Sequence, residues 1–271
     1  MEPSDIGVSP DQMDAEPLID FQALQGSLDD LRAQYLAARP WPHLVLHDLF
    51  PSRTLASVKE ECLDIPSREM SRQDGRAQVK EETTELPGPE SRRMFELFEG
   101  PEFISFIEQI TGVDQLISDP SHAYAGVHRS RPGAFTLIHR DFRRHPQTML
   151  HHRVNVLLYL NQDWQESFGG HLELWPSDMS RRERLVVPSA NTLVLWETHD
   201  QTLHGFPEPV ACPPEDARIA LASYYYTTAP RSEKVKRRGP VFARRPQDSW
   251  RTGRRPPAQV LRAIIDSDRA F

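Results

Sequence analysis

The residues with the clearest capacity for chemistry are His139 and Asp141, which stand two positions apart. On a β-strand, residues i and i+2 point to the same face, so this imidazole and this carboxylate would converge on one point. A second histidine from another strand would complete a two-histidine, one-carboxylate set. Such a set suits Fe(II) and leaves coordination positions open for oxygen and a second reactant. The pair therefore predicts part of a mononuclear iron site.

The chain contains 11 histidines, so the remaining ligand has to be chosen by context. His204 follows a strand-like run and precedes a Gly-Phe-Pro turn, and Arg218 comes 14 residues later at the start of an apolar run, 218–226. A guanidinium binds a carboxylate through two parallel hydrogen bonds, which lysine does less well. We predict that His204 is the third iron ligand and that Arg218 binds the far carboxylate of an organic co-substrate.

Each of these residues also has an ordinary structural interpretation. His-X-Asp matches arise by chance, a single histidine such as His204 is more often a hydrogen-bonded structural residue, and a single arginine such as Arg218 is more often at the surface of a strand. It is the order and spacing of the four residues within strand-like segments that favour the iron site.

The elements that would position these residues are short apolar runs separated by Pro, Gly and Asn turns. This pattern predicts a double-sheet jelly roll or a similar barrel. The expected strands are 124–128, 134–138, 154–160, 171–175, 184–187, 192–196, 203–206 and 218–226.

The first part of the chain has a different pattern. Apolar residues at helical spacing predict a helix over 19–38, a strand over 43–50, a helix from Pro51 and a helix broken at Gly100-Pro101. The polar segment 67–93 is expected to be a long insertion, either a flexible lid near the site or a solvated loop.

These elements predict one domain with two flanking segments. The expected boundaries are an N-terminal arm (1–18), a single domain (19–230) with helical support (19–115) and a jelly-roll core (116–230), and a basic, Pro-rich C-terminal tail (231–271). The tail is expected to recruit an acidic partner or to fold back on the acidic protein, and the second outcome is favoured.

Composition restricts the class of protein. The 271 residues carry a net charge of −7, which argues against a general binder of nucleic acids or anionic membranes. No apolar run is long enough to cross a bilayer, and the first residues lack a signal-peptide pattern. Cys62 and Cys212 are read as reduced thiols, with a disulfide as the alternative, and the protein is predicted to be cytoplasmic. The oligomeric state is left open.

A specific resemblance adds to these arguments. The chain resembles the prolyl 4-hydroxylase-like branch of the Fe(II)/2-oxoglutarate-dependent dioxygenases, particularly its bacterial members. The matching pieces are 41–46, 131–133, 139–141, 153–161, 163–164, 169–174, 204–205 and 218–226. The resemblance implies a double-stranded β-helix with helices packed on one sheet. It also implies Fe(II), 2-oxoglutarate and O2 as the cofactor and co-substrates.

Two further residues are predicted to contact the co-substrate, Tyr159 from the resemblance and Asn155 from its place between apolar neighbours. Tyr159 resembles the tyrosine that hydrogen-bonds the co-substrate's 5-carboxylate in this family, with a plain core aromatic as its alternative. Asn155 should point into the barrel, where a buried amide needs partners, and a contact with the co-substrate is predicted. Arg131 stands where some relatives have a co-substrate tyrosine, which puts the contacts to the 1-carboxylate in doubt.

Other polar residues are given lesser roles. His145, His151 and His152 are expected at the surface or at the rim of the substrate site, His171 is expected to face away from the iron or to support it indirectly, and Ser223 is expected to assist Arg218.

The predicted activity is hydroxylation of an unactivated C–H bond with release of succinate and CO2. The substrate would be amino-acid-derived: a prolyl residue, an amino acid or a natural product. The alternatives are a catalytically silent binding module and a metal-dependent cupin-like enzyme of another class. Asp141 favours hydroxylation, since halogenating relatives replace this carboxylate with a small residue. Segments 67–93 and 142–152 are the expected determinants of specificity.

Overall fold

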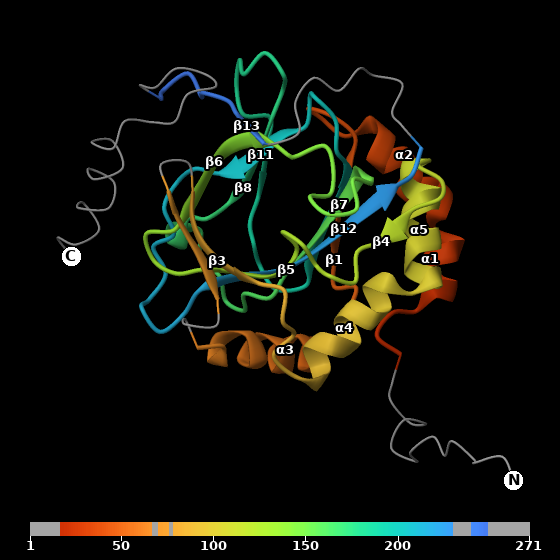
Figure 1. Cartoon of the computed structure of the whole chain (residues 1–271), viewed down its shortest axis with the longest axis horizontal. Helices are drawn as coiled ribbons and strands as arrows, with labels where there is room; N and C mark the ends of the chain where they lie inside the picture. The colour runs from red at the N-terminus through yellow and green to blue at the C-terminus, as the bar shows by residue number, and fades with distance from the viewer. Residues whose placement is uncertain (1–16, 67–69, 76–77, 230–239, 249–271) are drawn as a thin grey trace, which may run out of the picture.

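A curled antiparallel β-sheet forms the centre of the protein, for which we use a computed structural model describing residues 17–66, 70–75, 78–229 and 240–248 (Figure 1). The strands are β1 (His43–His47), β2 (Ser71–Gly75), β3 (Gln78–Thr83), β4 (Ile117–Ser118), β5 (Gly126–Ser130), β6 (Phe135–Arg140), β7 (His151–Tyr159), β8 (Leu172–Trp175), β9 (Arg184–Val186), β10 (Thr192–Glu197), β11 (Leu203–Phe206), β12 (Arg218–Thr227) and β13 (Val241–Phe242). The main path through the sheet is β1-β10-β7-β12-β5-β3-β6-β11-β8-β9. All eight predicted strands of the barrel are present, and the predicted jelly-roll fold is confirmed.

Strand β7 shows how the sheet separates a core from a chamber. Val154, Val156 and Leu158 are fully buried against the helices on the outside of the sheet. Asn155 and Tyr159 alternate with them and point to the inside of the barrel. The period of two along this strand therefore puts polar residues inside without breaking the apolar outer layer.

The helices gather along one side of the sheet (Figure 1). They are α1 (Phe21–Gly26), α2 (Leu28–Ala37), α3 (Ser52–Asp64), α4 (Pro89–Glu99) and α5 (Pro101–Thr111), with a short 3-10 helix at Glu166–Phe168. The break between α4 and α5 falls at Gly100, whose backbone is extended, and each helix begins with a proline. The prediction of a break at Gly100-Pro101 is confirmed.

The predicted helix over 19–38 is interrupted. Ser27 has a non-helical backbone, and its N–H bonds back to the last turn of α1, so α1 and α2 are two helices. The residue before it, Gly26, has a low helix propensity, so interrupting the helix here costs little free energy. Leu18, which was assigned to a loose arm, is buried in the core, while residues 1–16 lie outside the described part of the chain.

The expectation that 67–93 is a lid or a solvated loop is wrong for the residues described there. Strands β2 and β3 pair as a hairpin, β3 also pairs with both β5 and β6, and α4 begins at Pro89. A run of charged residues carried no apolar signal for a strand, yet its backbone completes the sheet.

Part of the predicted tail also joins the fold. Strand β13 pairs with β6, and Arg245 is buried between Glu208 and Asp248, with Nη–O distances of 2.5 and 3.1 Å. Residues 240–248 therefore fold back onto acidic residues of the protein, as the favoured interpretation expected, while 231–239 and 249–271 lie outside the described residues.

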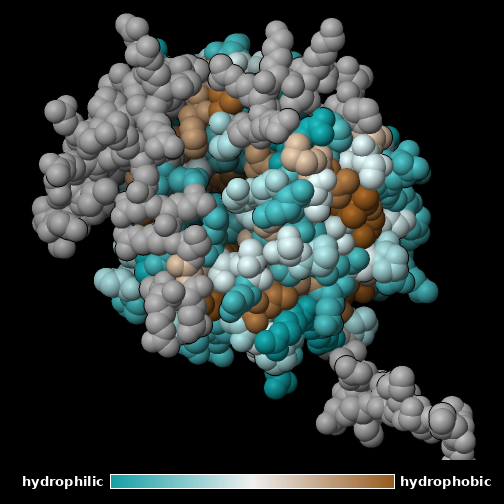
Figure 2. Space-filling view, viewed as in Figure 1, coloured by the Kyte–Doolittle hydropathy of each residue, from teal (hydrophilic) through white to brown (hydrophobic). Residues whose placement is uncertain are grey.

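Two remaining expectations concern the cysteines and membranes. Cys62 and Cys212 are both free and buried, so the reduced-thiol prediction is confirmed. Of the helices described, none combines the length and apolar character needed to span a bilayer. On the face shown in Figure 2, hydrophilic residues predominate and hydrophobic residues form small separate patches.

Candidate active site

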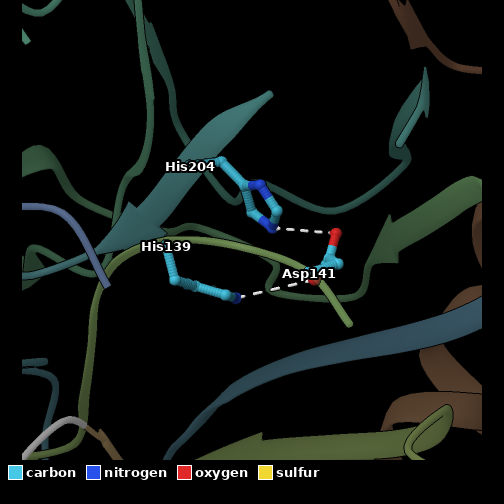
Figure 3. A group of neighbouring side chains, drawn as sticks. All are labelled: His139, Asp141 and His204. Atoms are coloured by element: carbon cyan, nitrogen blue, oxygen red, sulfur yellow. Dashed lines mark ion pairs between the residues drawn. The ribbon is translucent and has the colours of Figure 1, made fainter. Parts of the chain in front are cut away.

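Two neighbouring strands bring His139 and His204 together. His139 on β6 is paired directly with His204 on β11, and their ring centroids lie 4.6 Å apart. Each ring nitrogen Nδ1 lies next to a backbone carbonyl two residues earlier, that of Leu137 at 2.9 Å and that of Thr202 at 3.1 Å. An Nδ1–H donated to each carbonyl leaves both Nε2 lone pairs free, and these point toward the same space (Figure 3).

Asp141 closes this space from the residue position just beyond β6. Its Oδ1 lies 3.6 Å from Nε2 of His139, and its Oδ2 lies 3.7 Å from Nε2 of His204 (Figure 3). The three candidate ligand atoms all lie within 4.8 Å of one another. Two imidazole nitrogens and one carboxylate in this compact arrangement could hold one transition-metal ion.

The protonation states also suit a metal. The pKa of His204 is lowered to about 4, chiefly by burial; Asp141 opposes this shift, and the neighbouring His139 adds to it. Burial would raise the pKa of Asp141, but the positive potential of His204 and His139 outweighs it and the pKa lies below its ordinary value. A neutral imidazole and an ionised carboxylate at neutral pH are the forms that bind metals.

Two buried neighbours hold these groups in place. The Asn155 side-chain nitrogen donates a hydrogen bond to Oδ2 of Asp141 at 2.7 Å, which fixes the orientation of the carboxylate. The Trp196 ring packs edge-on against the His204 ring, with centroids 4.8 Å apart.

Arg218 lies in the same chamber, at the start of β12. Its Nε donates to the carbonyl of Gly170 at 2.6 Å, its Nη2 donates to the Tyr159 hydroxyl at 3.1 Å, and its guanidinium sits 4.1 Å from the centre of the Phe206 ring. Gly170 has a φ of +63°, and a Cβ there would lie 2.8 Å from Cδ of Arg218. A glycine at this position therefore leaves room for the arginine.

The charge of Arg218 is not neutralised by the protein around it. The residue is only 4% exposed, and no carboxylate among the described residues pairs with it. Burial lowers the pKa of Arg218 and raises that of Tyr159. Because an unpaired buried charge is costly, this position favours an anionic ligand.

The chamber that joins Arg218 to the metal-binding side chains is small and polar. Its volume is about 80 Å3. It is lined by the three candidate metal ligands, by their neighbours Asn155 and Trp196, and by Arg218. Two buried acceptor or donor atoms facing it, Oγ1 of Thr136 and Oδ1 of Asn155, have no hydrogen-bond partner in the described structure. Such atoms in native proteins usually mark a missing ligand or water. The residues present thus fit a metal ion together with a small dianion.

Comparison with known proteins gives this arrangement a family. Residues 125–226 match the family model of the 2OG-Fe(II) oxygenase superfamily. This part of the chain is a 2OG-Fe(II) oxygenase domain. The protein is accordingly a 2-oxoglutarate-dependent dioxygenase, with Fe(II) as its metal and 2-oxoglutarate as its co-substrate. A search of curated protein sequences finds no match.

Solved structures agree with the fold of this oxygenase. A prolyl-4-hydroxylase from Pseudomonas putida is 17% identical, with 75% of this chain and 98% of that chain covered and a TM-score of 0.52. A prolyl hydroxylase from Trichoplax adhaerens, in complex with a hypoxia inducible factor peptide fragment, is 16% identical, with 76% and 92% covered and a TM-score of 0.55. A prolyl 4-hydroxylase from Phytophthora capsici is 19% identical, with 83% and 72% covered and a TM-score of 0.54.

Several lesser predictions about the site are wrong. His145, His151 and His152 were expected at the surface or at the rim of the substrate site. All three are buried, so none is a surface residue, although His145 lines a cavity next to the metal-binding cluster as expected for a rim residue. His151 and His152 belong to β7, and the His152 ring stacks on Phe142 with centroids 4.6 Å apart. The polar loop is shorter than predicted, because β7 already begins at His151.

Two other expectations have different outcomes. Ser223 alternates with Tyr224 on β12 and points to the face opposite Arg218, where it hydrogen-bonds Tyr225, so it does not assist the arginine. His171 is half-buried and lies outside the metal-binding cluster, as expected.

Sequence reasoning missed the contributions of β3 and β13. Gln78 and Lys80 of β3 line both the chamber and the space outside it, and Phe242 of β13 packs 5.7 Å from His139, centroid to centroid. The one available signal was the two-residue spacing of Gln78, Lys80 and Glu82, which is weak in a run of polar residues.

Proposed function

We propose that His139, Asp141 and His204 bind the iron of this dioxygenase and that Arg218 binds the far carboxylate of 2-oxoglutarate. The observation that carries the proposal is the buried, unneutralised guanidinium of Arg218 in the same chamber as the three candidate ligands. Tyr159 supports this role, because its hydroxyl accepts from Arg218 and can donate its own hydrogen to the same carboxylate.

The remaining predicted contact, Asn155, has a more specific geometry than the sequence suggested. One of its amide hydrogens is used by Asp141, and its Oδ1 is an acceptor that would repel a carboxylate. We infer that Asn155 chiefly orients the carboxylate of Asp141, and that a direct contact with 2-oxoglutarate would have to use its second amide hydrogen.

The proposed reaction is hydroxylation of an unactivated C–H bond in an amino-acid-derived substrate. Bound Fe(II) and 2-oxoglutarate supply the oxidising chemistry, in which O2 is consumed, the keto acid becomes succinate and CO2, and one oxygen atom enters the substrate. The protein keeps His204 neutral and Asp141 ionised, neutralises the far carboxylate and places the substrate carbon beside Asp141 and His139. The buried cation Arg218 favours this assignment over a zinc-dependent hydrolase, whose reaction does not itself require an anionic co-substrate.

Spectroscopy tests the assignment directly. Anaerobic addition of Fe(II) and 2-oxoglutarate should produce a weak visible charge-transfer band in the wild-type protein. His139→Ala, Asp141→Ala and His204→Ala should each lose iron binding and turnover. If the wild type binds iron and shows no band with 2-oxoglutarate, the co-substrate assignment is wrong.

A substrate screen should follow succinate formation above the uncoupled background. The prolyl substrates suggested by the names of the Pseudomonas putida and Trichoplax adhaerens proteins belong in this screen, next to free amino acids and natural products.

A further inference from the structure

A second cavity lies directly outside the metal-binding chamber. It has a volume of about 410 Å3 and shares His139, Asp141 and Tyr224 with the chamber. This volume is within the range of sites that bind small molecules. A molecule in this cavity would present a carbon atom to the proposed iron ligands, whereas Arg218 lines the inner chamber and not this cavity.

The wall of the cavity is largely aromatic. The rings of Tyr124, Phe142, Tyr224 and Phe242 line it. Phe142 lies 5.2 Å from Tyr124 and 6.0 Å from Tyr224 between ring centroids, so these three rings form one continuous surface. Aromatic faces of this kind bind flat or ring-shaped apolar groups.

The charge of the cavity is opposite to that of the protein. Among the described residues that line it, the cations are Lys80 and Arg144, and the acid is the proposed iron ligand Asp141. Lys80 is paired with Glu82 at 2.8 Å, so part of its charge is offset. Arg144 has only the Met149 carbonyl as a partner in the described structure, at 3.3 Å. On a chain with a net charge of −7, this excess of positive charge is a local feature.

The loop that carries Arg144 is held in a fixed conformation. The next residue, His145, is buried, and its Nε2 lies 2.9 Å from Oδ2 of Asp119. Its Nδ1 accepts hydrogen bonds from the backbone N–H groups of Gln147 and Thr148 at 3.2 and 3.1 Å. These contacts fix the backbone beside Arg144, so the start of its side chain is held next to the cavity before a ligand arrives.

Backbone strain occurs at the mouth of the same cavity. Tyr124 and Met149 have φ values of +65° and +60°, and both are large exposed hydrophobic residues. Non-glycine residues in the left-handed region are uncommon and cluster at ligand-binding sites.

We propose that this cavity binds a small organic acid whose apolar ring packs on Tyr124, Phe142 and Tyr224 and whose carboxylate pairs with Arg144. The proposal rests on the proposed function and narrows it, because a free carboxylate excludes the internal residue of a peptide chain as the preferred substrate. A planar guanidinium matches a carboxylate through two hydrogen bonds.

Matched pairs of an acid and its uncharged amide test this proposal. The probes are 3-phenylpropanoate and N-acetyl-L-proline, each compared with its primary amide, and they are titrated by calorimetry into the full chain loaded anaerobically with Fe(II) and 2-oxoglutarate. Each acid should bind about tenfold or more tightly than its amide, because only the acid makes charge-assisted hydrogen bonds. Arg144→Gln should abolish this preference by weakening the acid alone.

Two further variants control the result. Arg144→Lys should keep part of the preference, and Arg53→Gln, which removes an exposed arginine on α3, should keep all of it. The proposal is overturned if the amides bind as tightly as the acids, if the preference survives Arg144→Gln, or if neither acid binds. The charge-transfer band of the same samples separates this failure from a failure of the proposed function, because the band reports on 2-oxoglutarate and the titration reports on the acid.

Discussion

Replacing Asn155 by alanine should weaken iron binding about 10- to 100-fold. The wild-type amide donates to Oδ2 of Asp141 over 2.7 Å, and hydrogen bonds to charged groups contribute roughly 1.5–3 kcal/mol. Since about 1.4 kcal/mol corresponds to a factor of ten, this contribution converts to about one or two powers of ten in the dissociation constant. Residues that orient metal ligands have effects of about the same size.

The assay has two separate readouts. Fe(II) affinity is measured anaerobically without 2-oxoglutarate, and the KM for 2-oxoglutarate is then measured at saturating iron. If Asn155 acts through Asp141, the iron dissociation constant rises and the KM changes little. If its principal contact is with the co-substrate, the KM rises and the iron dissociation constant does not.

Leu157→Ala is the matched control. Leu157 lies on the same strand and also lines the chamber, but it has no polar atom to offer a ligand. An unchanged iron dissociation constant in Asn155→Ala would refute the argument from the hydrogen bond. So would an equal rise in both variants, because that result would point to general loss of packing.

Three other perturbations test separate parts of the site. Arg218→Met should raise the KM for 2-oxoglutarate at least about 100-fold with little effect on iron affinity, because it removes a charged hydrogen-bonding group. Tyr159→Phe should raise the same KM about tenfold, because it removes a neutral one. Equal KM values in wild type and variants would place the carboxylate of 2-oxoglutarate elsewhere. The metal-free protein should lose thermal stability as the pH falls from 6.5 toward about 4. Burial depresses the pKa of His204 in the folded protein, so in this pH range protons bind the unfolded chain preferentially. A melting temperature that does not change over this pH range, or that falls as much in His204→Gln, would contradict this. Arg245→Met removes the pairing with Glu208 and Asp248 that anchors β13, so substrate KM should rise while the 2-oxoglutarate KM stays constant; parallel changes in both would argue against a local effect.

The strands and the candidate site could be predicted because their signals are local. His139 and Asp141 share a face through a spacing of two, and alternation along β7 separated Asn155 and Tyr159 from the apolar outer residues. The pairing of His139 with His204 could not be read from either strand alone. It depends on the register of β6 and β11, which the sequence near each histidine does not specify.

The errors have physical causes as well. Strand β3 is made mostly of charged and polar residues, and it is held in the sheet by backbone hydrogen bonds to β5 and β6, so hydrophobic periodicity did not reveal it. His145 and His152 were placed outside because histidine in a polar run is usually exposed. In the structure their partners, Asp119 and Phe142, make burial favourable, and Asp119 is distant from His145 in sequence.

The outer cavity beside β6 is built partly by the segment that matches the oxygenase family and partly by strands on either side of it. Every proposed iron and 2-oxoglutarate contact falls within 125–226, the segment that matches the oxygenase family. The strands β3 and β13, which pair with β6 and line the outer cavity, come from before and after that segment. Substitutions in these two strands would therefore reshape one part of the outer cavity without changing any proposed contact to iron or 2-oxoglutarate.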